Sequence, residues 1–416
     1  MLKISVKKSE TSRFNLERLA IRQERGREIG MPKRIGHLYE KFSDREWVKW
    51  VLTEACKYRN GRKDVEVVKN DLDNKTEELC RMLETGTFIP HEARSRLMFD
   101  SSCQKHRTIS TVPFYPDCCV QWLIVEAMKQ PVFMRGMDAY CSASIPGRGG
   151  IHVYKKIKEH MAKKYKQSKY ALQMDVRHYY DNVSIPILMK KLERRCKDRK
   201  MLDLIHSIIS ASASDKVNQK GLAIGLYLNQ WLANFFLEDV DRAVRESGLA
   251  PCFVRYMDNL TVIGSSKRKL RKLKELVERN LKEIQLELKG DWQIFRTKDR
   301  DIRAVGYRFF ANGSVMLRKR NWLKMRRQFI RVERDLREKK TTPLIRARST
   351  LSRIGNLVHL STPRVIQEKY VNGKIDRGLL KRIIAEYEGR SIGNACIIVH
   401  YSEGGGTGGT AILCKR

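Results

Sequence analysis

The chain has 416 residues, more than one typical domain and enough to bury two or three modest cores. Lysine and arginine number 84 against 47 aspartates and glutamates, so the formal net charge is +37 and a polyanion is the expected partner. No membrane role is expected, because no apolar run approaches the roughly 20 residues of a spanning helix and the N-terminus lacks the apolar segment of a signal peptide.

The first third of the chain is predicted to be a polar arm followed by helices. Residues 1–34 are basic with scattered apolar positions, which is typical of an arm that orders on nucleic acid. From 35 to 86, apolar residues recur every three or four positions and predict helices. Residues 96–115 change to two short strands, and 117–129 are an apolar helix that ends before Pro131.

The middle of the chain alternates strands and helices without βαβ regularity. The expected elements are a strand over 170–175, a helix after the N-cap Ser184, a long helix from Gly225 past Asp241, a hairpin over 253–263, a charged helix over 266–286, and strands around 305–310 and 315–317. This order predicts the α+β class with an antiparallel sheet.

The segment after Ala311 is helical and very basic. Between Ala311 and Thr350 there are thirteen lysines or arginines against three acidic residues. Because residues such as Met325 and Phe329 supply an apolar face, the cations must occupy the other sides. That bias favours phosphate contacts over a merely solvated face. The last residues, 396–416, are glycine-rich and are expected to be a flexible tail.

Two aspartates, Asp175 and Asp258, stand where apolar strands end. A carboxylate at a strand end is exposed yet held by a rigid sheet, which suits a metal site. Nucleotidyl transfer by two Mg²⁺ ions needs such a pair, since Mg²⁺ takes its remaining ligands from waters and substrate phosphates. The alternative for each aspartate is a turn cap, which is the commoner role of an aspartate in that position.

Seven short blocks surround these aspartates. Residues 174–181 read MDVRHYYD and residues 255–259 read RYMDN. The other blocks are residues 105–109, 144–149, 221–230, 286–289 and 305–310. In sequence and order they resemble bacterial-type reverse transcriptases, with a D-x-x-x-[FY]-[FY]-D block and a Y-x-D-D hairpin. The resemblance covers roughly residues 35–320.

The resemblance implies a right-hand polymerase. Its expected parts are a basic extension over 1–34, fingers with the start of the palm over 35–170, a palm over 171–310, a helical thumb over 311–395 and the tail. It implies an RNA-directed DNA polymerase that uses two Mg²⁺ ions, for which Mn²⁺ can substitute. The implied partners are template RNA, cDNA or an RNA/DNA hybrid, and dNTPs; a small basic protein or a structured non-coding RNA is a candidate accessory partner.

Catalytic and metal-binding roles carry over position by position. Asp175 and Asp258 are the implied metal ligands, with the backbone carbonyl of Val176 as an extra one. Asn259 stands at the second aspartate of the hairpin. Lys289 is the implied general acid for the departing pyrophosphate, and a plain surface lysine is the alternative.

Substrate-binding roles also follow from the resemblance. Tyr180 occupies the place of an aromatic steric gate that rejects a 2′-hydroxyl, and an ordinary core aromatic is the alternative. The residues expected at the dNTP are Lys105, Arg107, Tyr180, Ile224, Gly225 and Gln230. The residues expected at the primer or duplex are Gly306, Tyr307, Lys319, Arg320, Arg326, Arg327 and Arg334.

The sequence departs from the family pattern at two places. Asn259 removes one carboxylate, which should weaken metal affinity; the alternative is that Asn259 makes a structural hydrogen bond in the hairpin. Ile224 with Gln230 resembles the reverse transcriptases of diversity-generating retroelements, which copy with low fidelity. However, Asn229 replaces the family's serine, and related bacterial enzymes share the aliphatic residue with glutamine.

Three functions therefore stay open. The first is a reverse transcriptase of a diversity-generating retroelement, or of the related retron-like lineage. The second is a phage-defence enzyme of the abortive-infection type, and the third is a catalytically weak RNA-binding scaffold of the same fold. The ten cysteines form no C-x-x-C pair, so they are expected to be reduced thiols in the cytoplasm, in a bacterial or phage-encoded protein.

Overall fold

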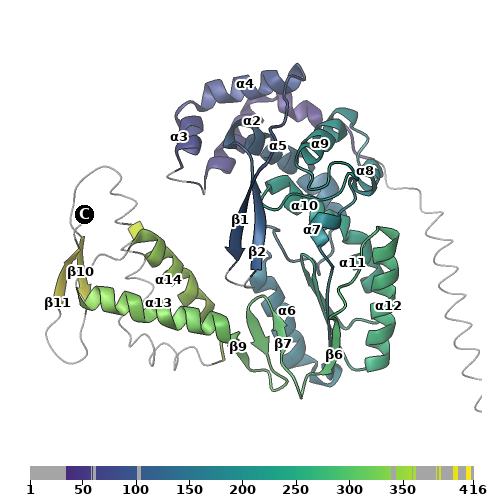
Figure 1. Cartoon of the computed structure of the whole chain (residues 1–416), viewed down its shortest axis with the longest axis vertical. Helices are drawn as coiled ribbons and strands as arrows, with labels where there is room; N and C mark the ends of the chain where they lie inside the picture. The colour runs from purple at the N-terminus through teal and green to yellow at the C-terminus, as the bar shows by residue number, and fades with distance from the viewer. Residues whose placement is uncertain are drawn as a thin grey trace, which may run out of the picture. The chain divides into compact units, whose positions relative to one another are not determined.

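The computed structural model describes residues 34–57, 59, 62–100, 105–338, 343–357, 359–361, 381, 384–385, 397–401 and 409–413. Nearly all of the predicted N-terminal arm lies outside these residues. The described residues form two compact units (Figure 1). The first unit comprises the described residues of Met1–Arg94, Thr111–Gly136 and Ser184–Leu232, and the second those of Ser95–Ser110, Met137–Val183 and Ala233–Arg416.

The first unit is helical, as predicted for residues 35–86. Its described helices are η1 Tyr39–Ser43, α2 Arg45–Cys56, α3 Lys63–Asn70, α4 Leu72–Glu84, η2 Phe114–Cys118, α5 Cys119–Met128, η3 Lys129–Met134, α8 Ile185–Glu193 and α9 Arg199–Ala211. Helix α2 begins where the Asp44 carboxylate accepts a hydrogen bond from the N–H of Trp47, at 3.1 Å. The apolar helix predicted over 117–129 is confirmed as α5, which is buried along most of its length.

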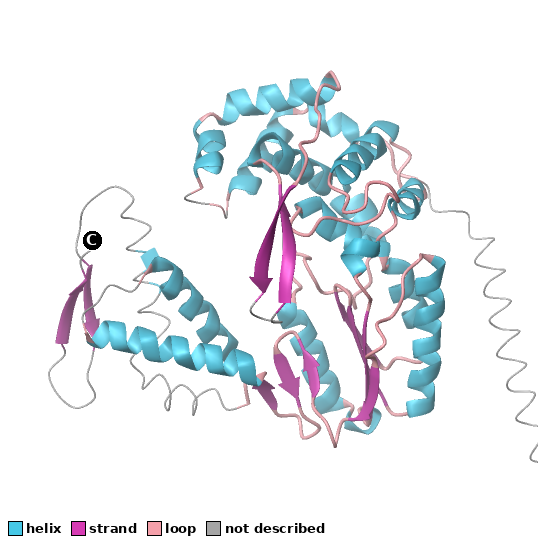
Figure 2. Cartoon of the chain, viewed as in Figure 1, coloured by secondary structure: helices cyan, strands magenta, loops and turns pink. Residues whose placement is uncertain are grey.

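The second unit contains a four-stranded antiparallel sheet in the order β4-β5-β3-β6. Its strands are β3 Tyr170–Asp175, β4 Cys252–Tyr256, β5 Asn259–Gly264 and β6 Gln293–Arg296. The predicted strand and hairpin are confirmed as β3 and β4–β5, and with them the α+β class. Figure 2 distinguishes the strands (magenta) from the helices (cyan).

Helices pack on both faces of this sheet. Helix α6, Gly150–Lys163, packs on the face that carries Ala171, because its Val153 and Ile157 share a core cluster with that residue. Helix α12, Lys267–Glu283, packs against β3 and β5, and its Leu270 lies against Gly264. Other described helices of the unit are η4 Tyr165–Gln167, α7 Tyr179–Asn182 and α11 Glu238–Glu246. Helix α10, Tyr227–Phe236, runs from the first unit into the second.

The second unit also contains smaller sheets, two of which lie before Lys319 in the chain. A hairpin of β1 Arg94–Asp100 and β2 Lys105–Thr111 confirms the two strands predicted over 96–115. The other sheet consists of β7 Ile302–Ala304, β8 Tyr307–Phe309 and β9 Val315–Leu317. The strand predicted over 305–310 is shorter, because Val305 and Gly306 have positive φ angles of 42° and 89° and form the turn from β7 to β8.

The basic segment is helical, as predicted. Helices α13 Lys319–Arg337 and α14 Leu344–Leu357 pack on each other, with Met325 and Phe329 buried in the core that also contains α6. Within the predicted tail, Ile397–Tyr401 and Gly409–Leu413 pair as β10 and β11. The prediction did not include these strands, although Ile397 opens a run of β-branched residues that favours extended backbone.

Candidate active site

The two predicted carboxylates lie at the same end of adjacent strands. Asp175 is the last residue of β3 and pairs with Asn259, the first residue of β5. Asp258 lies in the two-residue turn between β4 and β5, where Met257 takes a left-handed φ of 54°. The N–H of Val176 donates to the carbonyl oxygen of Asp258 at 3.1 Å, which ties the end of β3 to the turn.

The electrostatics of the pair favour a cation. Burial raises the pKa of Asp175 to about 6, and the charge of Asp258 adds to the rise. Burial likewise raises the pKa of Asp258. The side-chain amide of Asn259 donates to Oδ1 of Asp258 at 3.0 Å, the hairpin hydrogen bond expected in the structural alternative for this residue. Two half-buried carboxylates that repel each other would gain from a shared cation.

Lys289 lies beside this pair, and a third carboxylate, that of Asp291, lies close to Lys289 and Asp175. The backbone N–H of Lys289 donates to the carbonyl oxygen of Asp175 at 2.8 Å, and its Nζ forms an ion pair with Asp291 at 2.7 Å. Asp291 also contributes to the raised pKa of Asp175. Sequence reasoning missed Asp291, although its spacing two residues after Lys289 was a usable signal. The predicted general-acid role of Lys289 stays a prediction.

The oxygen donors at this end of the sheet fit Mg²⁺, a hard cation that prefers carboxylates and carbonyls. Within the described ranges, no three histidine, cysteine, aspartate or glutamate side chains are grouped as a metal site. The predicted ligands stay Asp175 and Asp258, and the substrate's phosphates and waters would supply the remaining ligands. The carbonyl of Val176 follows Asp175 directly and stays a predicted ligand.

A buried ion pair holds the turn that carries Asp258. Arg255 on β4 and Asp241 on α11 have side chains that are 0% and 1% exposed, and their closest atoms are 2.6 Å apart. The guanidinium also donates to the carbonyl oxygen of Met257 at 3.0 Å and to that of Asn234 at 3.2 Å. Sequence reasoning missed this pair, because its partners come from different elements.

The two tyrosines of residues 174–181 occupy different environments. Tyr179 is buried and its hydroxyl donates to the carbonyl oxygen of Ala233. Tyr180 contacts the Tyr179 ring edge-on, with centroids 5.6 Å apart, and its hydroxyl lies 3.6 Å from the sulfur of Met257. Burial raises the pKa of Tyr180 to about 12, and the charge of Asp258 adds to it. Tyr179 is thus the core aromatic, whereas Tyr180 adjoins the turn.

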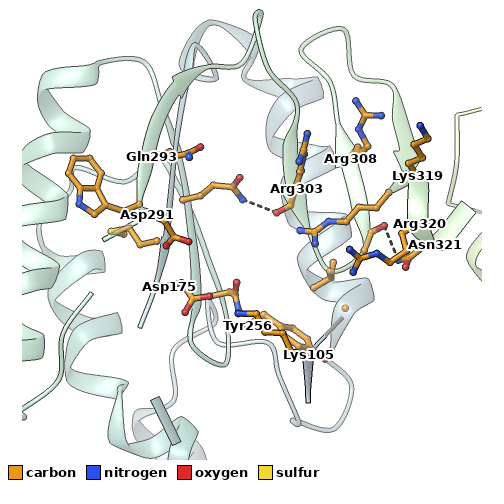
Figure 3. A pocket seen from close by; sticks show the side chains of 18 of the residues that line it. Lys105, Asp175, Tyr256, Asp291, Gln293, Arg303, Arg308, Lys319, Arg320 and Asn321 are labelled. Atoms are coloured by element: carbon orange, nitrogen blue, oxygen red, sulfur yellow. Dashed lines mark hydrogen bonds between the residues drawn. The ribbon is translucent and has the colours of Figure 1, made fainter. Parts of the chain in front are cut away.

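A cleft of about 1080 Å³ opens over this end of the sheet (Figure 3). Its charged lining residues are Lys105, Arg107, Asp175, Asp291, Arg300, Arg303, Arg308, Arg318, Lys319 and Arg320. Figure 3 shows Asp175 and Asp291 on the side of the large sheet, with Arg303, Arg308 and Arg320 across from them. The predicted residues Lys105, Arg107, Gly306, Lys319 and Arg320 are thereby brought to one cleft with Asp175 and Asn259.

One wall of the cleft, here called the arginine wall, carries Arg303, Arg308 and Arg320 (Figure 3). A buried carboxylate holds the first two of these side chains. Asp301 is 8% exposed and accepts from Nε of Arg303 at 3.2 Å and from Nη2 of Arg308 at 3.0 Å. The carbonyl oxygen of Arg303 accepts from the Gln173 side chain at 2.8 Å, which connects the two sheets. Asp301 offsets only part of the charge of these arginines, so the wall keeps a net positive charge that would attract phosphates.

Gly306 lies at the edge of this wall, in the β7–β8 turn. A Cβ atom at Gly306 would lie 2.8 Å from the side-chain amide nitrogen of Asn321. The φ angle of 89° at this position also favours glycine. The carbonyl oxygen of Gly306 accepts from the N–H of Arg318 at 3.0 Å. Tyr307, the next predicted contact, is 4% exposed and its hydroxyl bonds to Asn356, so its ring packs in the core.

The residues that line this cleft do not include the other predicted site residues, among them Asp258, Val176, Tyr180 and Lys289 of the same unit. Ile224 and Gly225 precede α10 and Gln230 lies on it, and all three belong to the first unit. Their role at the dNTP stays a prediction. Three predicted duplex contacts are exposed along α13: Arg326, Arg327 and Arg334.

Comparisons with known proteins bear on the segment that contains the two aspartates. The family model for reverse transcriptase (RNA-dependent DNA polymerase) matches residues 94–309. The group II intron-encoded protein LtrA of Lactococcus lactis subsp. cremoris is 23% identical over 179 residues, which are 41% of this chain and 28% of LtrA. The chain thus spans less than a third of that relative's length.

Similar solved structures include two telomerases. The structure of apo telomerase from Candida tropicalis has a TM-score of 0.40 at 14% identity and covers 55% of this chain and 49% of that one. The telomerase from Candida albicans with a fragment of telomeric RNA has a TM-score of 0.40 at 12% identity and covers 73% of this chain and 64% of that one.

Proposed function

Because the chain belongs to the reverse transcriptase (RNA-dependent DNA polymerase) family, we propose that it extends a DNA strand along an RNA template at Asp175 and Asp258. The observation that carries the proposal is the meeting of these carboxylates at adjacent strand ends, next to a cleft that Asp175 lines and whose other charged residues are mostly cations. A right-hand polymerase fold agrees with the mixed helices and antiparallel sheet.

The proposed parts follow the predicted boundaries. Residues 35–170 are fingers with the start of the palm, 171–310 the palm and 311–395 the thumb. The β1–β2 hairpin then contributes Lys105 and Arg107 to the triphosphate, and α13 contributes its exposed arginines to the duplex. The net charge of +37 supports nucleic acid as the partner in both places.

The predicted site residues each have a proposed task in the reaction. Asp175 and Asp258 would hold two divalent cations, Mg²⁺ or Mn²⁺ in its place, whose charge would favour ionisation of the 3′-hydroxyl and stabilise the leaving pyrophosphate. Lys289 gives a proton to the pyrophosphate. Tyr180 stands against C2′ of the nucleotide and excludes a 2′-hydroxyl. The arginine wall beside Gly306 holds the phosphates of the primer strand.

Primer extension by single variants tests the proposal. Asp175→Ala and Asp258→Ala should each lower dNTP incorporation about 1000-fold or more, because the neighbouring carboxylate of Asp291 is paired with Lys289 and should not replace either ligand. RNA binding should persist, since the cations of the cleft are unchanged. Asp203→Ala, an exposed aspartate on α9, is the matched control and should retain incorporation. Incorporation near the parent level in either active-site variant would refute the assignment.

Two observations support finer roles. Ile224 with Gln230 supports low-fidelity copying for a diversity-generating retroelement, which a misincorporation assay on adenine-containing template RNA would test. A neighbouring template repeat with a variable target gene would agree with that role, whereas an isolated defence cassette would favour the phage-defence role. Asn259, hydrogen-bonded to Asp258, supports the weak-enzyme alternative, an RNA-binding scaffold. Absence of extension with any metal would favour that scaffold.

The proposed setting is the cytoplasm of a bacterium, with template RNA, cDNA and dNTPs as partners and a small basic protein or structured RNA as accessory. In the part of the chain that the structure describes, no helix is both long and apolar enough to cross a membrane.

A further inference from the structure

A second basic site lies at the end of the large sheet remote from Asp175. In the strand register, Tyr170 at the start of β3 pairs with Gly264 on one side and Arg296 on the other. Five residue steps separate Tyr170 from Asp175, so this end lies about 17 Å from the active-site aspartates. Nothing in the proposed polymerase reaction uses it.

A cavity of about 370 Å³ opens at this end. Its lining residues are Tyr165, Ser168, Lys169, Tyr170, Arg296, Thr297, Lys298 and Ala311. The walls are fixed to each other, because the hydroxyl of Thr297 donates to the carbonyl oxygen of Ser168 at 2.5 Å and its N–H donates to that of Lys169 at 3.1 Å. Tyr165 lines the cavity and is 66% exposed.

The charged residues that line the cavity are all cations. No carboxylate lines it, and in the described part of the chain Lys169, Arg296 and Lys298 form no ion pair with an acidic side chain. Helix α12 starts three residues after Gly264, at the same end, and its first turn has cations and no acidic residue. We call the cavity residues Tyr165, Lys169, Arg296 and Lys298 the distal surface.

We propose that the distal surface binds single-stranded nucleic acid. Cations without counter-charges attract phosphates, and an exposed tyrosine ring offers a platform on which an unpaired base can stack. A duplex keeps its base faces covered, so it could not use Tyr165 in this way. The proposal goes beyond polymerisation and does not depend on it, because binding here uses none of the active-site residues.

Fluorescence anisotropy with a labelled oligonucleotide of about 12 residues tests the proposal. Unlabelled RNA/DNA hybrid is added in excess to occupy the cleft, at about 0.15 M salt. Tyr165→Ala should weaken binding at least about 5-fold, whereas Tyr165→Phe, which keeps the ring, should bind within about 2-fold of the parent. Lys298→Glu should also weaken binding. Its matched control is Lys282→Glu, an equal charge change at the exposed far end of α12.

Photocrosslinking with a 4-thiouridine oligonucleotide locates the contact, and adducts should appear on the peptide that contains Tyr165. An RNA preference in anisotropy would assign the surface to the template and a DNA preference to the cDNA, and either supports the proposal. Unchanged affinity in Tyr165→Ala, or equal losses in Tyr165→Ala and Tyr165→Phe, would overturn it. Crosslinked adducts found only on peptides of the cleft would also overturn the proposal. So would a Lys298→Glu variant that no longer binds phosphatidylserine vesicles but binds the oligonucleotide as the parent does.

Discussion

Replacing Asp241 with asparagine would leave the guanidinium of Arg255 buried without a counter-charge. Because both side chains are at most 1% exposed, the loss should cost about 3–5 kcal/mol of unfolding free energy. For a unit of 150–250 residues each kcal/mol lowers Tm by about 2–4 °C, so a fall of roughly 6–20 °C is expected. Thermal unfolding followed by circular dichroism measures it.

The same variant should also alter catalysis, because Arg255 donates to the carbonyl oxygen of Met257 in the turn that carries Asp258. A loosened turn should hold Asp258 less firmly against Asp175, and the Mg²⁺ concentration for half-maximal primer extension should rise. Both quantities come from one preparation, so stability and metal requirement can be compared directly.

A double variant separates the two effects. Arg255→Met with Asp241→Leu replaces the pair by apolar side chains and should recover most of the stability. It cannot restore the hydrogen bond to Met257, so its Mg²⁺ requirement should stay high. If Asp241→Asn melts with the parent, the ion pair does not stabilise the unit. If the double variant recovers the parent's Mg²⁺ curve as well, Arg255 does not position the turn.

Three further predictions concern the site itself. Tyr180→Ala should open space at C2′ and raise the rNTP to dNTP incorporation ratio, and an unchanged ratio would place the gate elsewhere. Asn259→Asp adds a carboxylate beside Asp258, so the Mg²⁺ concentration for half-maximal primer extension should fall about 5-fold. The parent should need an unusually high Mg²⁺ concentration, and Mn²⁺ should rescue its activity. Superimposable Mg²⁺ curves for the two proteins would show that Asn259 does not affect metal binding. The pKa of Asp175 is raised from 3.8 to about 6, so the metal-free folded chain binds more protons than the unfolded chain between those values. The unfolding free energy of the metal-free protein should therefore rise as pH falls through this window. Over the same window the Mg²⁺ concentration for half-maximal activity should increase, because protons compete with the metal. Asp175→Asn should flatten the dependence of the unfolding free energy on pH.

The individual strands and helices, and the functional groups that they carry, could be predicted from the amino-acid sequence. Strand β3 was predictable because an apolar run ends in Asp175, and the β4–β5 hairpin because two such runs flank Met257 and Asp258. The apolar face of α13 followed from helical spacing, and net charge indicated a polyanionic partner. These features depend on neighbours within a few residues, which is the range over which backbone propensity and side-chain period act.

Which of these elements meet depends on long-range packing, which local patterns do not reveal. The pairing of Asp175 with Asn259 joins strands that are distant in the chain, and no local pattern fixes that register. The Arg255–Asp241 ion pair could not be predicted from the sequence, because its partners come from different elements that only packing brings together. The cavity that Tyr165 lines is formed by residues 165–170, 296–298 and Ala311, and contacts between such distant segments depend on the packing of the whole core.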